Sequence, residues 1–231
     1  MSIASALQEV QGRIAAAARA AGREPQEVKL VAVSKTHPAE AVREAYAAGQ
    51  RDFGENYVQE LVQKAEALAD LPDLRWHLIG HLQRNKAKLV APLVSLVHTV
   101  DSLELGRELA KRRSAAGKSE RLPVLVEVSI AGEEQKHGLA PTQLAELLGA
   151  LEQLPQLWLR GLMCVPPLTE DAALSRPHFD ALVRLRAQHG GAARLPELSM
   201  GMTHDLEHAV AAGATLVRVG TAIFGSRPPK P

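Results

Sequence analysis

The 231-residue sequence has little of several residue types, and each shortage excludes a class of protein. Its single cysteine, Cys164, can form no internal disulfide, so we expect a reducing compartment. Aromatic residues make up 3% of the chain, and 27 basic residues nearly balance 26 acidic ones. Without a basic face or interleaved aromatic residues, we expect no nucleic acid partner. The longest apolar stretch, residues 89–100, is too short to cross a bilayer, so we expect no membrane partner.

The N-terminus lacks the pattern of a signal peptide, because Glu9 and Arg13 interrupt its apolar residues. Apolar residues recur there at helical spacing instead, at Ile3, Leu7, Val10 and Ile14. We therefore expect a cytoplasmic protein that begins with a helix.

What the sequence does contain is a regular alternation of apolar strand patterns with helical patterns. Strands are predicted at 29–35, 51–55, 74–80, 93–100, 123–130, 157–163, 197–200 and 215–219. Helices are predicted at 39–48, 57–69, from about 82 to Pro92, from 101 or 102 to about 116, and at 141–154, 177–188 and 203–212. Eight such units predict one (β/α)8 TIM barrel with an extra N-terminal helix, and we expect residues 1–231 to form a single domain. A doubly wound open sheet is the alternative, but no Gly-x-Gly-x-x-Gly follows the first strand.

Lys35 ends the first strand, and its parity matches Val31 and Val33. If that face lines the barrel, the amine points inward, where desolvation lowers its pKa and allows attack on a carbonyl. Taken alone, the segment favours an ordinary surface lysine that ends a strand before a turn.

The turns after the last two strands hold small residues, at Ser199-Met200-Gly201 and Gly220-Thr221-Ala222. In TIM barrels these loops, with the start of a short extra helix, frequently bind phosphate. Hydroxyls of Ser199 and Thr221 and backbone N–H groups at the glycines suit an anion, although any barrel needs turns there.

Arg218 lies in an apolar strand with inward parity, where a guanidinium is costly without a partner. It can pair with an inward carboxylate such as Glu127 or Glu55, or it can face a ligand acceptor. Opposite a pyridine nitrogen, it would keep that nitrogen unprotonated.

Five ordered segments together are more specific than any single residue. They are VAVSK at 31–35, FGENYVQE at 53–60, WHLIGHLQRNK at 76–86, SMGM at 199–202 and GTAIFG at 220–225. These segments resemble the pyridoxal phosphate homeostasis protein family, whose barrel is similar to the N-terminal domain of alanine racemase. The resemblance implies bound pyridoxal 5'-phosphate, with Lys35 as the aldimine lysine and Arg218 facing the pyridine nitrogen.

The resemblance also implies roles for further residues. It assigns Ser199, Met200, Gly201, Gly220, Thr221 and Ala222 to the phosphate, Asn56 and His77 to positions beside the ring, and Lys136 to a secondary acceptor role.

Two other patterns invite a functional reading. His204-Asp205-Leu206-Glu207-His208 matches the H-x-x-E-H zinc pattern, but no further ligand is evident, and we expect a solvated helix and no metal. The basic stretch 81–88 is interpreted as an exposed helix face.

Three functions compete. The first is a carrier that buffers pyridoxal phosphate or delivers it to apo-enzymes, as a monomer or weak dimer. The second is a racemase-like or decarboxylating enzyme, and the third is a barrel enzyme for another phosphorylated metabolite. Racemases of this type take a second acid/base tyrosine from an appended domain, whereas Tyr46 and Tyr57 are the tyrosines here and the sequence stops after the last motif. We therefore expect the carrier, without efficient catalysis.

Overall fold

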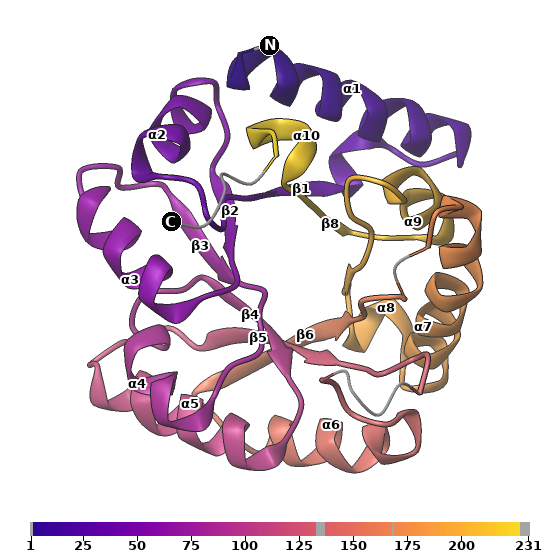
Figure 1. Cartoon of the computed structure of the whole chain (residues 1–231). Coiled ribbons are helices and arrows are strands. Elements are labelled where there is room, and N and C mark those ends of the chain that lie inside the picture. Colours follow the sequence, from indigo (N-terminus) through magenta and orange to yellow (C-terminus); the bar gives the residue numbers. More distant parts are fainter. Residues whose placement is uncertain (1, 133–136, 168, 227–231) are drawn as a thin grey trace.

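Eight parallel strands close into a barrel in the order β1 to β8, with helices around it (Figure 1). The computed structural model describes residues 2–132, 137–167 and 169–226. The strands are β1 Lys29–Val33, β2 Asp52–Glu55, β3 Arg75–Leu78, β4 Leu96–Val100, β5 Leu122–Glu127, β6 Leu157–Met163, β7 Glu197–Ser199 and β8 Leu216–Val219. The TIM barrel is confirmed, and the open-sheet alternative is wrong because β8 pairs with β1 and closes the sheet.

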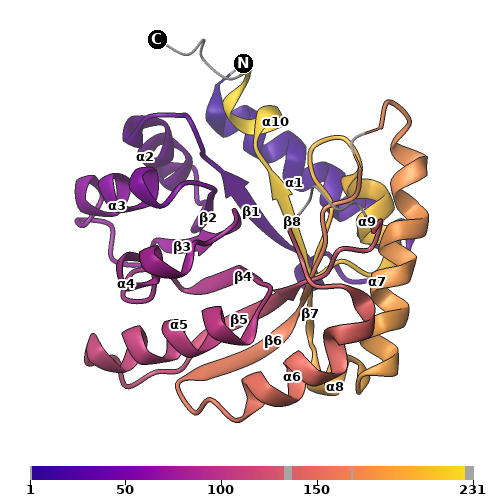
Figure 2. The same ribbon diagram turned by 60° about the horizontal axis from the view of Figure 1, so that its bottom comes forward.

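Ten α-helices are present in the described part of the chain. They are α1 Ile3–Ala20, α2 Ala39–Ala47, α3 Val58–Ala67, α4 Ala87–Val90, α5 Leu103–Ala115, α6 Leu144–Glu152, α7 Arg176–Gln188, α8 Gly191–Arg194, α9 Leu206–Ala212 and α10 Thr221–Phe224. The N-terminal helix is confirmed, and α1 packs against α9 and α10 through a face that buries Leu7, Val10 and Ile14 (Figure 2). None of these helices is both long and apolar enough to span a membrane.

Several predicted boundaries are wrong, each for a local reason. The helix predicted from residue 82 begins at Ala87, after a 3₁₀ turn over Arg84–Lys86. The strand predicted from residue 93 begins at Leu96, because the backbone N–H groups of Leu93 and Val94 donate to the Val90 carbonyl and continue the helix as a turn. Ser102, rather than Asp101, caps α5 by accepting from the Leu105 N–H.

The helix predicted from residue 203 begins at Leu206 instead. The Asp205 carboxylate accepts a hydrogen bond from the Met202 N–H at 2.7 Å, which holds residues 202–205 as a turn before the helix. His204 therefore precedes the helix, so the H-x-x-E-H residues do not share one helical face.

Strand alternation separates two environments. Outward side chains such as Leu30, Ala32 and Phe53 join the large core under the helices. Inside the barrel one cluster is apolar, formed by Val31, Leu96, Leu125, Met163 and Leu216. The interior also contains buried polar side chains, namely those of Asp52, His77, His98, Ser199 and Arg218. The barrel interior is thus a packed core with a polar part.

Candidate functional site

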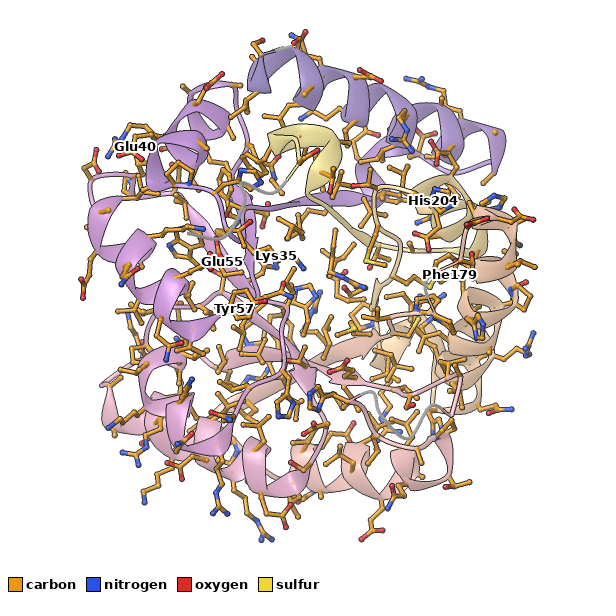
Figure 3. The ribbon with its side chains drawn as sticks, viewed as in Figure 1. Lys35, Glu40, Glu55, Tyr57, Phe179 and His204 are labelled. Carbon is orange, nitrogen blue, oxygen red and sulfur yellow. The ribbon has the colours of Figure 1, made fainter. Side chains whose placement is uncertain are left out.

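Lys35 lies in the turn that follows β1, at the mouth of the barrel (Figure 3). We use mouth for the end formed by residues that follow the strands, such as Lys35, Asn56 and Gly220. The His37 N–H donates to the Ser34 carbonyl at 3.1 Å and closes the turn. Thr36 has a φ of 68°, which is rare for a β-branched residue. Strained backbone of this kind persists only where its surroundings hold it.

A buried ion pair holds the residue before Lys35. The Glu55 carboxylate accepts from the Ser34 hydroxyl at 2.7 Å and from the Lys64 ammonium at 2.6 Å, and Lys64 also donates to the Ser34 carbonyl at 2.7 Å. Burial raises the pKa of Glu55, although Lys64 and Ser34 counteract it. Ser34 is therefore fixed through both its side chain and its backbone.

A second carboxylate holds the residue after Lys35. Glu60 accepts from the Thr36 N–H at 2.7 Å and from Lys64 at 3.3 Å. Lys64 consequently links the two carboxylates that flank the turn. Sequence reasoning did not single out Glu60 and Lys64, because only the fold shows that α3 packs beneath this turn.

Arg218 lies near the C-terminal end of β8, and its side chain is almost completely buried. Its Nη1 donates to Ser199 Oγ at 2.5 Å, and its Nη2 donates to the Cys164 carbonyl at 3.0 Å. Burial lowers the pKa of the Arg218 guanidinium. Of the two alternatives for Arg218, the ion pair with Glu127 or Glu55 is wrong for the described structure, since Glu55 pairs with Lys64 and Glu127 forms no salt bridge with Arg218.

The predicted phosphate residues come from two turns that lie side by side. The Arg218 N–H donates to the Gly201 carbonyl at 2.9 Å, which brings the turn after β7 against β8. Gly201 has a φ of 90°, and a Cβ there would meet Ala209 Cβ at 2.4 Å, so the position requires glycine. α10 starts at Thr221, and the N–H groups of Thr221 and Ala222 stand in its first turn, where backbone donors lack intrahelical acceptors.

Ser199 and Met200 are buried in this region. The Ser199 hydroxyl contacts both Arg218 and the Nδ1 atom of His98, the latter at 2.8 Å.

His77 lies inside the barrel. Its Nε2 is 2.9 Å from Asp52 Oδ1, and its Nδ1 is 2.9 Å from His98 Nε2. His77 is therefore joined to Ser199 through His98. Asp52 and His98 were missed by the sequence reasoning, although His98 shows the same signal as Arg218, a polar residue at an inward position of an apolar strand.

A cavity of about 290 Å³ opens beside Asn56 and Glu127. Asn56 Oδ1 and Glu127 Oε2 are buried and have no hydrogen-bond partner among the described residues. Buried polar atoms are normally satisfied, so these two fit a site that is completed by a polar ligand. Burial, with a contribution from the Asp101 charge, raises the pKa of Glu127 to about 7, against the influence of Arg218.

The residues of the zinc pattern contact other groups. Glu207 forms an ion pair with Arg13 at 2.7 Å, and the His204 ring lies 3.0 Å from the Glu170 carbonyl. Among the described residues no cluster could hold a metal ion. The Cys164 thiol is buried, which raises its pKa to about 12 and makes it unreactive. Lys136 lies outside the described residues.

Residues 6–228 match the family described as alanine racemase, N-terminal domain. The chain is 48% identical to the pyridoxal phosphate homeostasis protein of Pseudomonas aeruginosa, over 98% of this chain and 96% of that one. It is 44% identical to the protein of the same name from Escherichia coli, over 97% of each chain. The chain therefore belongs to the alanine racemase N-terminal domain family, among the pyridoxal phosphate homeostasis proteins, and the resemblance inferred from the motifs is confirmed.

Solved structures agree with this assignment. PipY from Synechococcus elongatus superposes with a TM-score of 0.86 without pyridoxal phosphate, at 42% identity, and with 0.83 when pyridoxal phosphate is bound, at 41% identity. Each comparison covers 97% of this chain and 100% of PipY. An alanine racemase from Clostridium difficile, at 13% identity and a TM-score of 0.71, shares the fold.

The raised pKa of Glu127 predicts a specific dependence of stability on pH. Because its folded pKa of about 7 exceeds its ordinary value of 4.5, the native state binds this proton more tightly than the unfolded state. Glu127 therefore lowers the free energy of unfolding as pH rises through that window, by on the order of 3 kcal/mol in total. Glu127→Gln cannot ionise, so its stability relative to wild type should rise between pH 4.5 and pH 7 and then stay constant. Denaturant unfolding of both proteins across this pH range measures the difference in their free energies of unfolding. A difference that does not change with pH would contradict the raised pKa of Glu127.

The pair beneath the Lys35 turn predicts a second result. Lys64→Met leaves the Glu55 carboxylate buried without its cation, which should lower the free energy of unfolding by about 3 kcal/mol or more. Lys64→Met combined with Glu55→Gln buries no charge and should recover most of that loss. Lys88→Met, at an exposed position, is the matched control. Equal stability of the Lys64 and Lys88 variants would show that the buried pair is not required.

Proposed function

We propose that this protein binds pyridoxal 5'-phosphate and buffers or delivers it in vitamin B6 homeostasis, without efficient catalysis. One observation supports this most strongly. The turn that bears Lys35, the buried guanidinium of Arg218 and the glycine turns at Gly201 and Gly220 all belong to neighbouring strands β1, β7 and β8. An amine, a fixed cation and backbone donors match an aldehyde, a ring nitrogen and a phosphate on one small molecule.

The predicted site residues have the following roles in this proposal, except His77, whose two ring nitrogens contact Asp52 and His98. The cofactor supplies an aldehyde that condenses with a lysine amine with loss of water, and Lys35 is that lysine. Arg218 donates to the ring nitrogen with N–H groups that are not used by Ser199 or Cys164. Asn56 contacts the ring substituents through its unsatisfied oxygen. The phosphate contacts the two turns, formed by Ser199, Met200, Gly201, Gly220, Thr221 and Ala222.

The arginine favours retention of the cofactor over catalysis. A guanidinium stays protonated, so a ring nitrogen that accepts from it remains neutral and withdraws electrons weakly. Neither tyrosine is held ready for proton transfer at the site. Tyr46 donates to the Asp73 carboxylate, and Tyr57 is 54% exposed.

One observation favours the alternative of a racemase-like enzyme. Glu127 lines the cavity at the mouth, and a carboxyl group with a pKa of about 7 is suited to acid/base catalysis. Three further points stay predictions. They are the transfer of the cofactor to recipient apo-enzymes, a monomeric or weakly dimeric state, and a secondary acceptor role for Lys136.

The cofactor assignment predicts the behaviour of two lysines, Lys35 in the turn that follows β1 and Lys29 at the start of β1. Lys35→Ala should lose the visible absorbance band that pyridoxal phosphate gives when linked to a lysine. Lys29→Ala, at the opposite end of β1, should keep it. Borohydride reduction of the wild-type protein followed by peptide mapping should place the modification on Lys35. A full band in Lys35→Ala with the reduced adduct on another lysine, such as Lys136, would overturn the assignment.

The carrier assignment predicts slow chemistry on amino acids. Protein loaded with pyridoxal phosphate is incubated in deuterated water with a panel of L-amino acids, and exchange at Cα is followed by NMR. We expect rates far below those of ordinary enzymes, which turn over at about 1 per second or faster. Exchange at about 1 per second or faster in the wild-type protein, lost in Glu127→Gln, would instead establish the racemase-like alternative.

A further inference from the structure

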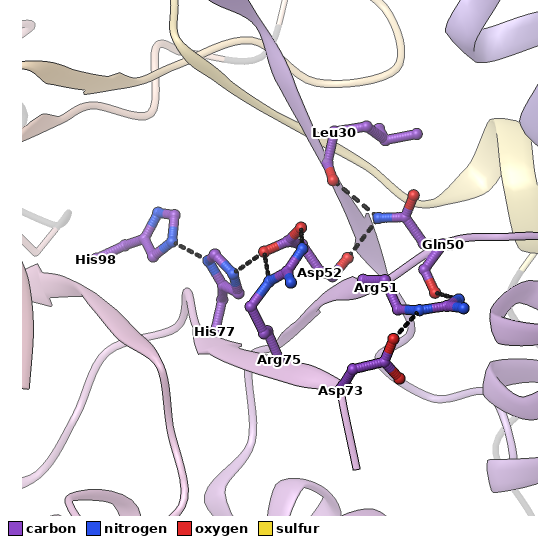
Figure 4. A network of polar contacts seen from close by, with 8 residues as sticks. All are labelled: Leu30, Gln50, Arg51, Asp52, Asp73, Arg75, His77 and His98. Carbon is purple, nitrogen blue, oxygen red and sulfur yellow. Dashed lines mark hydrogen bonds and ion pairs between the residues drawn. The ribbon is translucent and has the colours of Figure 1, made fainter. Parts of the chain in front are cut away.

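A continuous line of polar side chains crosses the barrel interior from Arg218 to Asp52. Arg218 contacts Ser199, Ser199 contacts His98, His98 contacts His77, and His77 contacts Asp52. The four separations are 2.5, 2.8, 2.9 and 2.9 Å. We call these five residues the polar chain, and Figure 4 shows its half from His98 to Asp52. It joins β8, β7, β4, β3 and β2, and all five members are buried.

The direction of every hydrogen bond in the polar chain follows from its two ends. A guanidinium only donates, so Ser199 Oγ accepts from Arg218 and has one proton to give to His98 Nδ1. His98 then has its proton on Nε2 and donates to His77 Nδ1. His77 has its proton on Nε2 and donates to Asp52, whose carboxylate only accepts. Both histidines are therefore neutral, with the proton on Nε2.

A reversed arrangement fits less well. If His77 were doubly protonated, it would donate to Asp52 and to His98 Nε2, and His98 would donate through Nδ1 to Ser199. Ser199 would then accept twice, and its own proton would have no acceptor among the described residues. Burying a hydroxyl proton without an acceptor is unfavourable, because the hydrogen bond it made to water is not replaced. The two arrangements differ in the protonation of both rings, so they can be distinguished by experiment.

We propose that Asp52, His77 and His98 are positioning residues for Arg218, which they orient and supply with a remote negative charge through the polar chain. What Arg218 faces at the mouth rests on the proposed function, but the direction of the chain does not. The polar chain ends with Asp52 at the floor of the barrel, the end formed by Lys29, Asp52 and Arg75 where the strands begin. Asp52 at the floor thereby influences the orientation and charge of Arg218, which donates to the ligand at the mouth.

The charges support this role. Burial opposes the ionisation of Asp52, but hydrogen bonds from Arg75 and His77 outweigh it and hold the pKa of Asp52 well below its ordinary value. Burial lowers the pKa of His98 well below its ordinary value, in agreement with a neutral ring. Arg218 makes no direct salt bridge among the described residues. Glu127 and Asp205 act on its charge through space, whereas Asp52 is the carboxylate that its hydrogen bonds reach. A chain of aligned hydrogen bonds between fixed charges strengthens each member.

The first experiment examines the ligand-free protein. Nitrogen-15 NMR of the imidazole rings, assigned with His77→Gln and His98→Gln, reports which nitrogens are protonated. We expect neutral rings at both positions with the proton on Nε2. A doubly protonated His77, or His98 with its proton on Nδ1, would overturn the direction of the polar chain.

The second experiment compares two aspartates at the same end of the barrel. Asp52→Asn keeps the size of the side chain but removes the charge that ends the polar chain. Asp73→Asn removes an exposed carboxylate that pairs with Arg51 outside the chain (Figure 4). Weakening one charge-assisted hydrogen bond corresponds to about a tenfold loss of affinity. We expect Asp52→Asn to raise the Kd for pyridoxal phosphate by about that factor and to shift the nitrogen-15 resonance of the labelled pyridine ring, whereas Asp73→Asn changes neither.

These results separate the inference from the proposed function. If the wild-type protein fails to bind pyridoxal phosphate, the proposed function is wrong, while the ring tautomers still decide whether the polar chain exists. If the wild-type protein binds and Asp52→Asn leaves both the Kd and the pyridine resonance unchanged, the positioning role is wrong. Should Asp52→Asn not fold, the same two readouts on His77→Gln decide the matter.

Discussion

The interior of a closed eight-stranded barrel is filled with side chains, so a charged group placed inside must be satisfied by its neighbours. Arg218 is such a group, and its guanidinium lies close to the mouth where the ligand is proposed to bind. Ser199 and the Cys164 carbonyl satisfy part of it, and the nearest fixed negative charge along the hydrogen bonds is Asp52 at the floor. Inward positions on several strands are therefore polar, because a single inward arginine requires them.

Strand β2 shows how one short segment serves several environments. Its inward Asp52 ends the polar chain, and its outward Glu55 holds the turn of Lys35 together with Lys64. The next residue, Asn56, lies at the mouth with an unsatisfied oxygen. Alternation of side chains along the strand separates these roles. The turn that bears Lys35 and the guanidinium of Arg218 are thus held by two different polar clusters, on opposite faces of the same sheet.

The sequence predicted the barrel because each strand and helix has a clear period, and it predicted inward positions for Arg218 and Val31 because parity is a local property. It could not predict the partner of Arg218, since Glu127 and Ser199 have the same parity and only the register between strands distinguishes them. The support of the Lys35 turn by Lys64 depends on how α3 packs, which no local pattern encodes. Boundaries near residues 82 and 203 were wrong because turns with side-chain or backbone hydrogen bonds replaced the first turn of a helix.

The two sides of the mouth differ in a way that bears on retention and catalysis. On the side of β7 and β8, donors are held by the protein's own hydrogen bonds before any ligand arrives, so binding there needs little reorganisation. On the other side, Asn56 and Glu127 have polar atoms without partners, and Glu127 has a pKa near neutrality. A group of that pKa can move a proton, but removal of a proton from Cα also needs a strong electron sink. In the proposed arrangement the Arg218 guanidinium faces the ring nitrogen and weakens that sink, so an acid/base group at the mouth would not be sufficient for rapid turnover.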